Sequence, residues 1–201
     1  PAEVVRIAFL GGSTTFSANA SGNEFTWAQL VVDQLRREYP KISFDYINAG
    51  IPGYTTATSK KNLRLRVAPQ KPNLIIIYHA TNDLTRFSRI AAKKEGIKFI
   101  PETGRMSWIS KYSLLFYLIE KNYLLWDTQK IIQKDGEKLT VPVDKLSEPF
   151  RESLLDLVKE SQKNSDKVVL ITFSVQIRAQ QRDEEKLQTA VTSLYYMPYI
   201  Q

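Results

Sequence analysis

Apolar and polar positions along the chain follow two periods, one typical of strands and one typical of helices. Apolar runs with the period or continuity of strands occupy residues 4–10, 42–48, 74–78 and 167–173. Helical spacing of apolar residues covers residues 25–38, 56–67, 81–94, 111–132 and 179–194, and another helix is predicted to begin after Ser147 with Pro149 in its first turn. Strands that alternate with helices predict an α/β fold with a parallel sheet and right-handed crossovers.

The domain organisation follows from the length and from one long interval between strands. A chain of 201 residues is expected to form a single domain over residues 1–201. Residues 97–149 form an insertion longer than a crossover between neighbouring strands needs. Within it, aromatic and aliphatic side chains recur at helical spacing over residues 112–126. This pattern favours packing in a core or against another subunit, with a lid over a binding site as the alternative.

Composition excludes some kinds of chemistry. The sequence holds no cysteine, so disulfides, thiol nucleophiles and thiolate metal sites are excluded. The net charge of +7 is spread over the whole length, which favours a solvated surface over a nucleic-acid interface. The apolar stretch at residues 112–126 contains Glu120 and Lys121 and is too short for a membrane span. No zinc spacing, phosphate loop or dinucleotide motif occurs, so no metal and no cofactor are expected, and the compartment is left undetermined.

Three of the predicted strands run into unusual residues. The first is followed by Gly-Gly-Ser-Thr at residues 11–14, the second leads into Asn-Ala-Gly-Ile-Pro-Gly-Tyr-Thr at residues 48–55, and the third runs into Thr-Asn-Asp at residues 81–83. Parallel strands end at one edge of their sheet, where open α/β folds bind ligands. We therefore expect these three loops to meet in space.

The residue types in these loops suit acyl transfer. Such a site needs a nucleophile and N–H donors that face the oxyanion of a tetrahedral intermediate. Ser13 supplies a hydroxyl. Its own backbone N–H, the N–H of Gly53 and the side-chain amide of Asn82 are the candidate donors.

The three motifs together resemble blocks I, II and III of the SGNH (GDSL-type) hydrolase superfamily, over residues 4–84. The resemblance implies a flavodoxin-like three-layer α/β/α sandwich, with four strands in this chain and the fifth missing. It also implies that Ser13 is the nucleophile and that Gly53 and Asn82 complete the oxyanion hole. The expected activity is hydrolysis of a carboxylic ester through an acyl-enzyme, with a small-molecule ester as the partner.

The sequence departs from this family at the position of the general base. Gly12 stands where block I often has aspartate, and Ala80 stands where block III often has glycine. The Asp-x-x-His of block V, which supplies the family's base, is absent. Three explanations stay open: the histidine and aspartate lie outside this chain, the protein is a noncatalytic binding module, or His79 substitutes as base. The first is favoured, and the 201-residue chain alone is then expected to have little or no activity.

Each candidate residue also has a purely structural interpretation. His79 follows an apolar strand and is expected to form part of the pocket wall rather than to act as base. Ser13 by itself is compatible with a helix N-cap, and Asn82 and Asp83 with an Asx turn. Asp83 is expected to hold the loop that presents Asn82. Homo-oligomers are expected through an exposed sheet edge, where the fifth strand would pair, or through the aromatic helix at residues 112–126.

Overall fold

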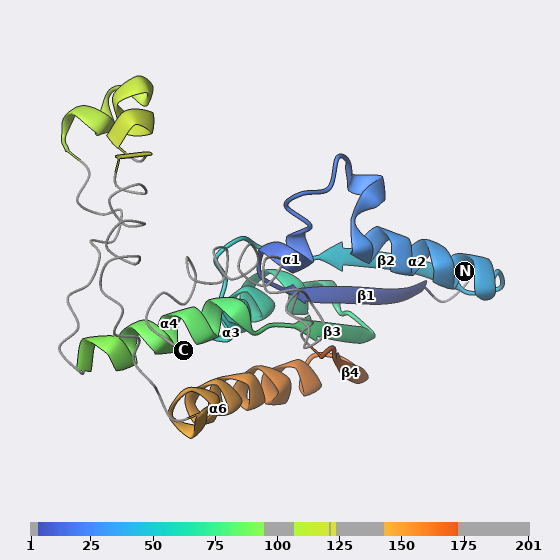
Figure 1. The fold of residues 1–201 in the computed structure, drawn as a ribbon. Coiled ribbons are helices and arrows are strands. Elements are labelled where there is room, and N and C mark those ends of the chain that lie inside the picture. Colours follow the sequence, from blue (N-terminus) through green and yellow to red (C-terminus); the bar gives the residue numbers. More distant parts are fainter. Residues whose placement is uncertain (1–3, 95–106, 121, 124–142, 173–201) are drawn as a thin grey trace, which may run out of the picture.

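Within the residues that the structure describes, four parallel strands form one sheet (Figure 1). A computed structural model describes residues 4–94, 107–120, 122–123 and 143–172. In chain order the strands are β1 (Val4–Gly11), β2 (Ser43–Asn48), β3 (Leu74–Tyr78) and β4 (Lys167–Leu170), and in space they run β2-β1-β3-β4. The predicted α/β class with a parallel sheet is confirmed.

Strand β1 lies in the middle of the sheet and pairs on both sides. Its residue Ala8 is opposite Ile47 of β2 and Ile75 of β3. The chain leaves β1 toward β2 and later returns on the opposite side to form β3. The carboxyl end of β1 is therefore the point where the strand order reverses, which is where open α/β sheets bind ligands.

Helices cover both faces of the sheet. The helical elements of the main body are α1 (Ser13–Phe16), η1 (Asn23–Phe25), α2 (Trp27–Glu38), α3 (Thr56–Asn62), the π-helical turn η2 (Leu63–Val67), η3 (Ala68–Gln70), α4 (Thr81–Lys94) and α6 (Val143–Gln162). Helix α2 lies on one face, and α3 with α6 lies on the other (Figure 1). The result is a three-layer α/β/α sandwich.

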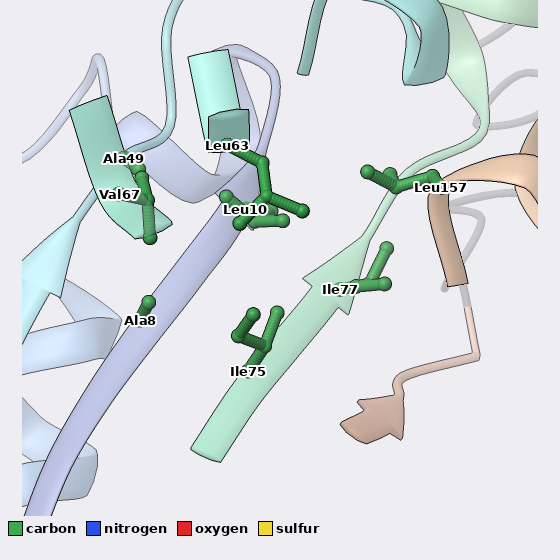
Figure 2. Packing of buried hydrophobic residues seen from close by; sticks show 8 residues of the cluster. All are labelled: Ala8, Leu10, Ala49, Leu63, Val67, Ile75, Ile77 and Leu157. Carbon is green, nitrogen blue, oxygen red and sulfur yellow. The ribbon is translucent and has the colours of Figure 1, made fainter. Parts of the chain in front are cut away.

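The alternation of side chains along β1 divides the core into two clusters. Ile7 and Phe9 point toward α2, where they pack against Ala28 and Val32. The other cluster lies beneath α3, η2 and α6, and its buried members are Ala8, Leu10, Ala49, Leu63, Val67, Ile75, Ile77 and Leu157 (Figure 2). Both faces of β1 and β3 are thus buried, which explains their continuous apolar sequences.

Two predicted elements differ from the structure. Helix α6 already begins at Val143, so the prediction that it starts after Ser147 with Pro149 in the first turn is wrong. Proline inside a helix removes one backbone hydrogen bond. Beyond the proline, Leu157 is fully buried against the sheet, and Leu154 packs against the same cluster. The helix predicted over residues 56–67 widens into the π-helical turn η2 after Asn62.

The insertion and the sheet edge contain exposed apolar side chains. Residues 114–120 and 122–123 are helical, as the aromatic pattern predicts, and residues 124–126 of that pattern lie outside the described ranges. Trp108, Tyr112 and Leu114 are among the exposed side chains of the insertion.

Strand β4 is an edge of the described sheet, with Leu170 exposed. No helix among the described residues is long and apolar enough to cross a membrane. The strand predicted to end at residue 173 and the helix predicted at 179–194 reach beyond the described residues.

Candidate active site

Ser13 lies at the carboxyl end of β1, as the first residue of the short helix α1. The N-cap of this helix is Gly12, and no side chain caps it, so the N-cap interpretation of Ser13 is wrong. The Ser13 side chain is half-buried, and within the described ranges its hydroxyl has no hydrogen-bond partner. The hydroxyl is thus available to a ligand or to a base.

The loop after β2 packs directly against the start of α1. The backbone N–H of Ile51 donates a hydrogen bond to the carbonyl of Gly11 at 3.2 Å. A Cβ on Gly50 would lie 2.7 Å from the carbonyl carbon of Thr15, so only glycine permits this approach. Gly53 is glycine for a different reason: its φ is +80°, and nothing lies within 4 Å of the place of its Cβ.

Asn82, in the first turn of α4, connects the third loop to the other two. Its Nδ2 donates a hydrogen bond to the carbonyl oxygen of Tyr54 at 2.9 Å. A Cβ on Gly12 would lie only 2.7 Å from the same Nδ2 and 3.5 Å from that carbonyl oxygen. The amide of Asn82 therefore lies against the backbone that precedes Ser13. The three strand-end loops meet at this point.

A hollow of about 630 Å³ opens beside Ser13. The described residues that line it are Ser13, Thr14, Ser17, Ala18, Asn19, Ala20, Phe25, Trp27, Tyr78 and Ile171. The indole N–H of Trp27 donates to the carbonyl of Thr14 at 3.0 Å, and its ring meets Phe9 edge-on at 5.0 Å between centroids. These contacts fix a flat aromatic wall next to the serine.

His79, expected in the pocket wall, is not among the residues that line this hollow; it lies in a buried polar cluster with Ser59 of α3 and Asp83 of α4. Its Nε2 is 2.8 Å from the hydroxyl of Ser59, a fully buried residue of α3. Burial lowers the pKa of His79 to about 4, so the imidazole is neutral at neutral pH. The ring of His79 is not part of the lining of the hollow.

Asp83 belongs to the same buried cluster. Both carboxylate oxygens lie 3.1 Å from the backbone nitrogen of Thr56, which donates to them, and the Thr56 hydroxyl donates to Oδ1 at 2.7 Å. Burial raises the pKa of this carboxyl, whereas the hydrogen bonds from Thr56 act to lower it. His79 Nδ1 is 3.8 Å from Asp83 Oδ2, which is too far for a hydrogen bond. Because His79 is neutral, the pair is not an ion pair at neutral pH.

Sequence reasoning missed three residues at or near the site. Trp27 falls on an apolar position of the helix predicted at residues 25–38, and this pattern carries no signal for its indole N–H. Thr56 begins a predicted helix, and its contact with Asp83 joins positions distant in sequence. Ser17 adopts a left-handed conformation with φ of 63°, and its buried Oγ lacks a partner among the described residues. The described residues include no group of acidic or histidine side chains that could hold a metal ion.

Comparison with known proteins places the chain in a family. The sequence profile of the GDSL-like Lipase/Acylhydrolase family matches residues 9–188, which is most of the chain. The chain belongs to this family, whose members are ester hydrolases. A search of curated proteins found no significant match.

The fold is shared with a solved acetylxylan esterase. The acetylxylan esterase Axe2 from Geobacillus stearothermophilus superposes with a TM-score of 0.50 at 18% identity, over 96% of this chain and 72% of that one. A two-domain esterase active on acetylated mannans is 28% identical over 48% of this chain, with a TM-score of 0.39. The present chain covers 28% of the length of that esterase.

Proposed function

We propose that this protein is a serine esterase that hydrolyses carboxylic esters through an acyl-enzyme, with Ser13 as the nucleophile. The observation that carries the proposal is the contact of Asn82 with Gly12 and Tyr54, which brings the three loops together beside the hollow that Ser13 lines. The family of ester hydrolases to which the chain belongs supports the same reaction class. No cofactor is needed for this chemistry.

In this mechanism the Ser13 hydroxyl attacks the carbonyl carbon of the ester. The carbonyl oxygen becomes an oxyanion, for which the backbone N–H groups of Ser13 and Gly53 and the side-chain amide of Asn82 are the donors. One N–H of the Asn82 amide is engaged by Tyr54, which orients the group, and the second is available for the oxyanion. Collapse of the intermediate releases the alcohol, and water then hydrolyses the acyl-enzyme.

The serine needs a general base, and His79 does not suit that role. It is the only histidine of the 201 residues, its ring lies within hydrogen-bond distance of the Ser59 hydroxyl, and burial lowers its pKa to about 4, which makes it a weak proton acceptor. We therefore assign the proton transfer to a histidine, oriented by an aspartate, that is not among these residues. Catalytic mutants of Axe2 replace a serine, an aspartate or a histidine, which is consistent with a triad of that kind.

A second candidate function rests on the same placement of His79. Without an accessible base, the hollow and the oxyanion donors form a site that binds an ester or an acid without cleaving it. This alternative is a noncatalytic binding module of the same family. It differs from the first in one measurable property, which is covalent reactivity of Ser13.

Labelling with a fluorophosphonate probe separates the two functions. The full-length product of the gene and its Ser13→Ala variant are treated with the probe, and the modified residue is located by peptide mass mapping. We expect Ser13 to be labelled in the wild type and both labelling and turnover of p-nitrophenyl acetate to vanish in the variant. Ser21→Ala, which removes an exposed hydroxyl outside the lining of the hollow, is the matched control and should keep both.

Labelling at another residue in the Ser13→Ala variant, with turnover unchanged, would refute the nucleophile assignment. A full-length product that is neither labelled nor active but binds an ester analogue would favour the binding module. The 201-residue chain alone is expected to turn over little or no ester.

A further inference from the structure

Residues 54–56 and 82–83 are joined by hydrogen bonds that run in both directions. Asn82 donates from its side chain to the carbonyl of Tyr54. Thr56 donates in return, from its backbone N–H and its hydroxyl, to the carboxylate of Asp83. The first segment directly follows Gly53, and the second contains Asn82 itself. The contacts therefore determine the distance between two of the proposed oxyanion donors.

The direction of the buried hydrogen bonds follows from the donor inventory. The Thr56 hydroxyl has one hydrogen, and it is directed to the Asp83 carboxylate, which in its ionised form only accepts. The Thr56 oxygen is also 2.6 Å from the hydroxyl of Ser153 on helix α6. Ser153 must then be the donor in this second bond. The order is Ser153 to Thr56 to Asp83, and it links helices α6, α3 and α4.

We infer that Ser153, Thr56 and Asp83 form a positioning network for the oxyanion donors of the proposed esterase. The inference rests on the proposed function. Thr56 and Asp83 are buried and Ser153 acts through Thr56, so none of the three is placed to touch the substrate. Asp83 and Thr56 are almost fully buried, which excludes water as a competitor for their hydrogen bonds.

The network has a direct consequence for catalysis. Loss of the Thr56 hydroxyl removes one donor to the carboxylate of Asp83 and leaves the backbone N–H of Thr56 as the remaining donor from that segment. The distance between the Gly53 N–H and the Asn82 amide is then less well defined. Because an oxyanion forms only during the reaction, such a change lowers kcat and leaves KM nearly unaffected.

Thr56→Val and Thr56→Ser in the full-length gene product test the inference. Valine keeps the volume and loses the hydroxyl, and serine keeps the hydroxyl. We expect Thr56→Val to lose about tenfold or more in kcat for p-nitrophenyl acetate, because misplacement of a catalytic group by an ångström is costly. KM should stay within about twofold, since uniform binding is not affected. Thr56→Ser should restore most of the turnover.

Ser153→Ala is the second variant and keeps the test decisive if Thr56→Val fails to fold. It removes only the donor from α6, and we expect a smaller decrease of kcat in the same direction. Ser165→Ala, which removes a hydroxyl bonded only to the backbone near β4, is the matched control and should leave kcat unchanged.

The outcomes distinguish the inference from the proposed function. If Ser13→Ala is inactive and folded Thr56→Val or Ser153→Ala keeps the wild-type kcat, the positioning network is refuted and the esterase stands. A decrease of stability without a change of kcat assigns these residues a structural role only and also overturns the inference. If Ser13→Ala keeps wild-type activity, the proposed function itself is refuted, and the inference that rests on it is refuted with it.

Discussion

The side-chain amide of Asn82 donates a hydrogen bond to the carbonyl oxygen of Tyr54 at 2.9 Å. This bond crosses from the loop after β3 to the loop after β2. It turns the amide toward the backbone of Gly12, which directly precedes Ser13. A donor that is already oriented before substrate arrives stabilises an oxyanion without reorganisation during the reaction.

Asn82→Ala should therefore lower kcat by about 10²–10³ in the full-length gene product, the usual effect of losing one oxyanion donor. Steady-state kinetics with p-nitrophenyl acetate measures the change. Gln34→Ala removes an amide from the exposed side of α2 and serves as the control. A wild-type kcat in folded Asn82→Ala would remove Asn82 from the mechanism.

Gly53→Ala should destabilise the protein through backbone strain and not through a clash. An L-residue at φ of +80° costs roughly 1–2 kcal/mol, although space for the methyl group is open. Gly22→Ala is the control, because Gly22 is extended with φ of −165° and the atoms nearest to its Cβ would be those of the flexible carboxylate of Glu24. Urea denaturation gives both free energies of unfolding. Equal values for the two variants would contradict the strain at Gly53.

Trp27→Phe should loosen the contact between the aromatic side of the hollow and the turn at Thr14, while the core stays folded. The variant keeps an aromatic ring against Phe9 and loses the hydrogen bond to the Thr14 carbonyl, which contributes about 0.5–1.5 kcal/mol. We expect kcat/KM to decrease severalfold, because the turn that carries Ser13 is less constrained. Trp108→Phe, at an exposed tryptophan of the insertion, is the control. Indistinguishable kcat/KM values for the two variants would argue against a role of Trp27 in the site.

The pH dependence of stability should show the burial of His79. Its folded pKa of about 4 is below the ordinary value of 6.5, so the folded state favours the neutral ring. The contribution of His79 to the free energy of unfolding is then fully present above pH 6.5. It decreases as the pH falls toward 4, by up to roughly 3 kcal/mol, because the unfolded state binds the proton first. Asp83 has the opposite effect on stability as the pH falls, because burial raises its pKa and the folded state then binds the proton more tightly than the unfolded state.

His79→Gln isolates the contribution of the imidazole. Urea denaturation at pH 7 and at pH 4.5 should show a smaller decrease of stability for this variant than for the wild type. The same decrease in both proteins would mean that His79 does not titrate between these pH values. The decrease of the free energy of unfolding at acid pH would then come from other titratable groups.

Most of the fold could be predicted from local sequence patterns. Continuous apolar runs predict β1 and β3 because both faces of these strands are buried. The start of α6 at Val143 could not be predicted, because Pro149 is a common start signal; the helix beyond it packs Leu157 against the sheet. That packing joins residues far apart in the chain and leaves no local signal.

Local patterns in the sequence predict the succession of strands and helices along the chain. They also predict the edge of the sheet where Ser13, Gly53 and Asn82 lie, because parallel strands place their carboxyl ends together. The direction of each strand-end side chain, in contrast, depends on contacts between segments far apart in the chain. His79 follows β3 as closely as the site residues follow their strands, yet it turns under α3 to Ser59. Thr56 meets Asp83 across the boundary of two helices. Local periodicity sets which face a residue occupies, and only the packing of helices onto the sheet selects its partner.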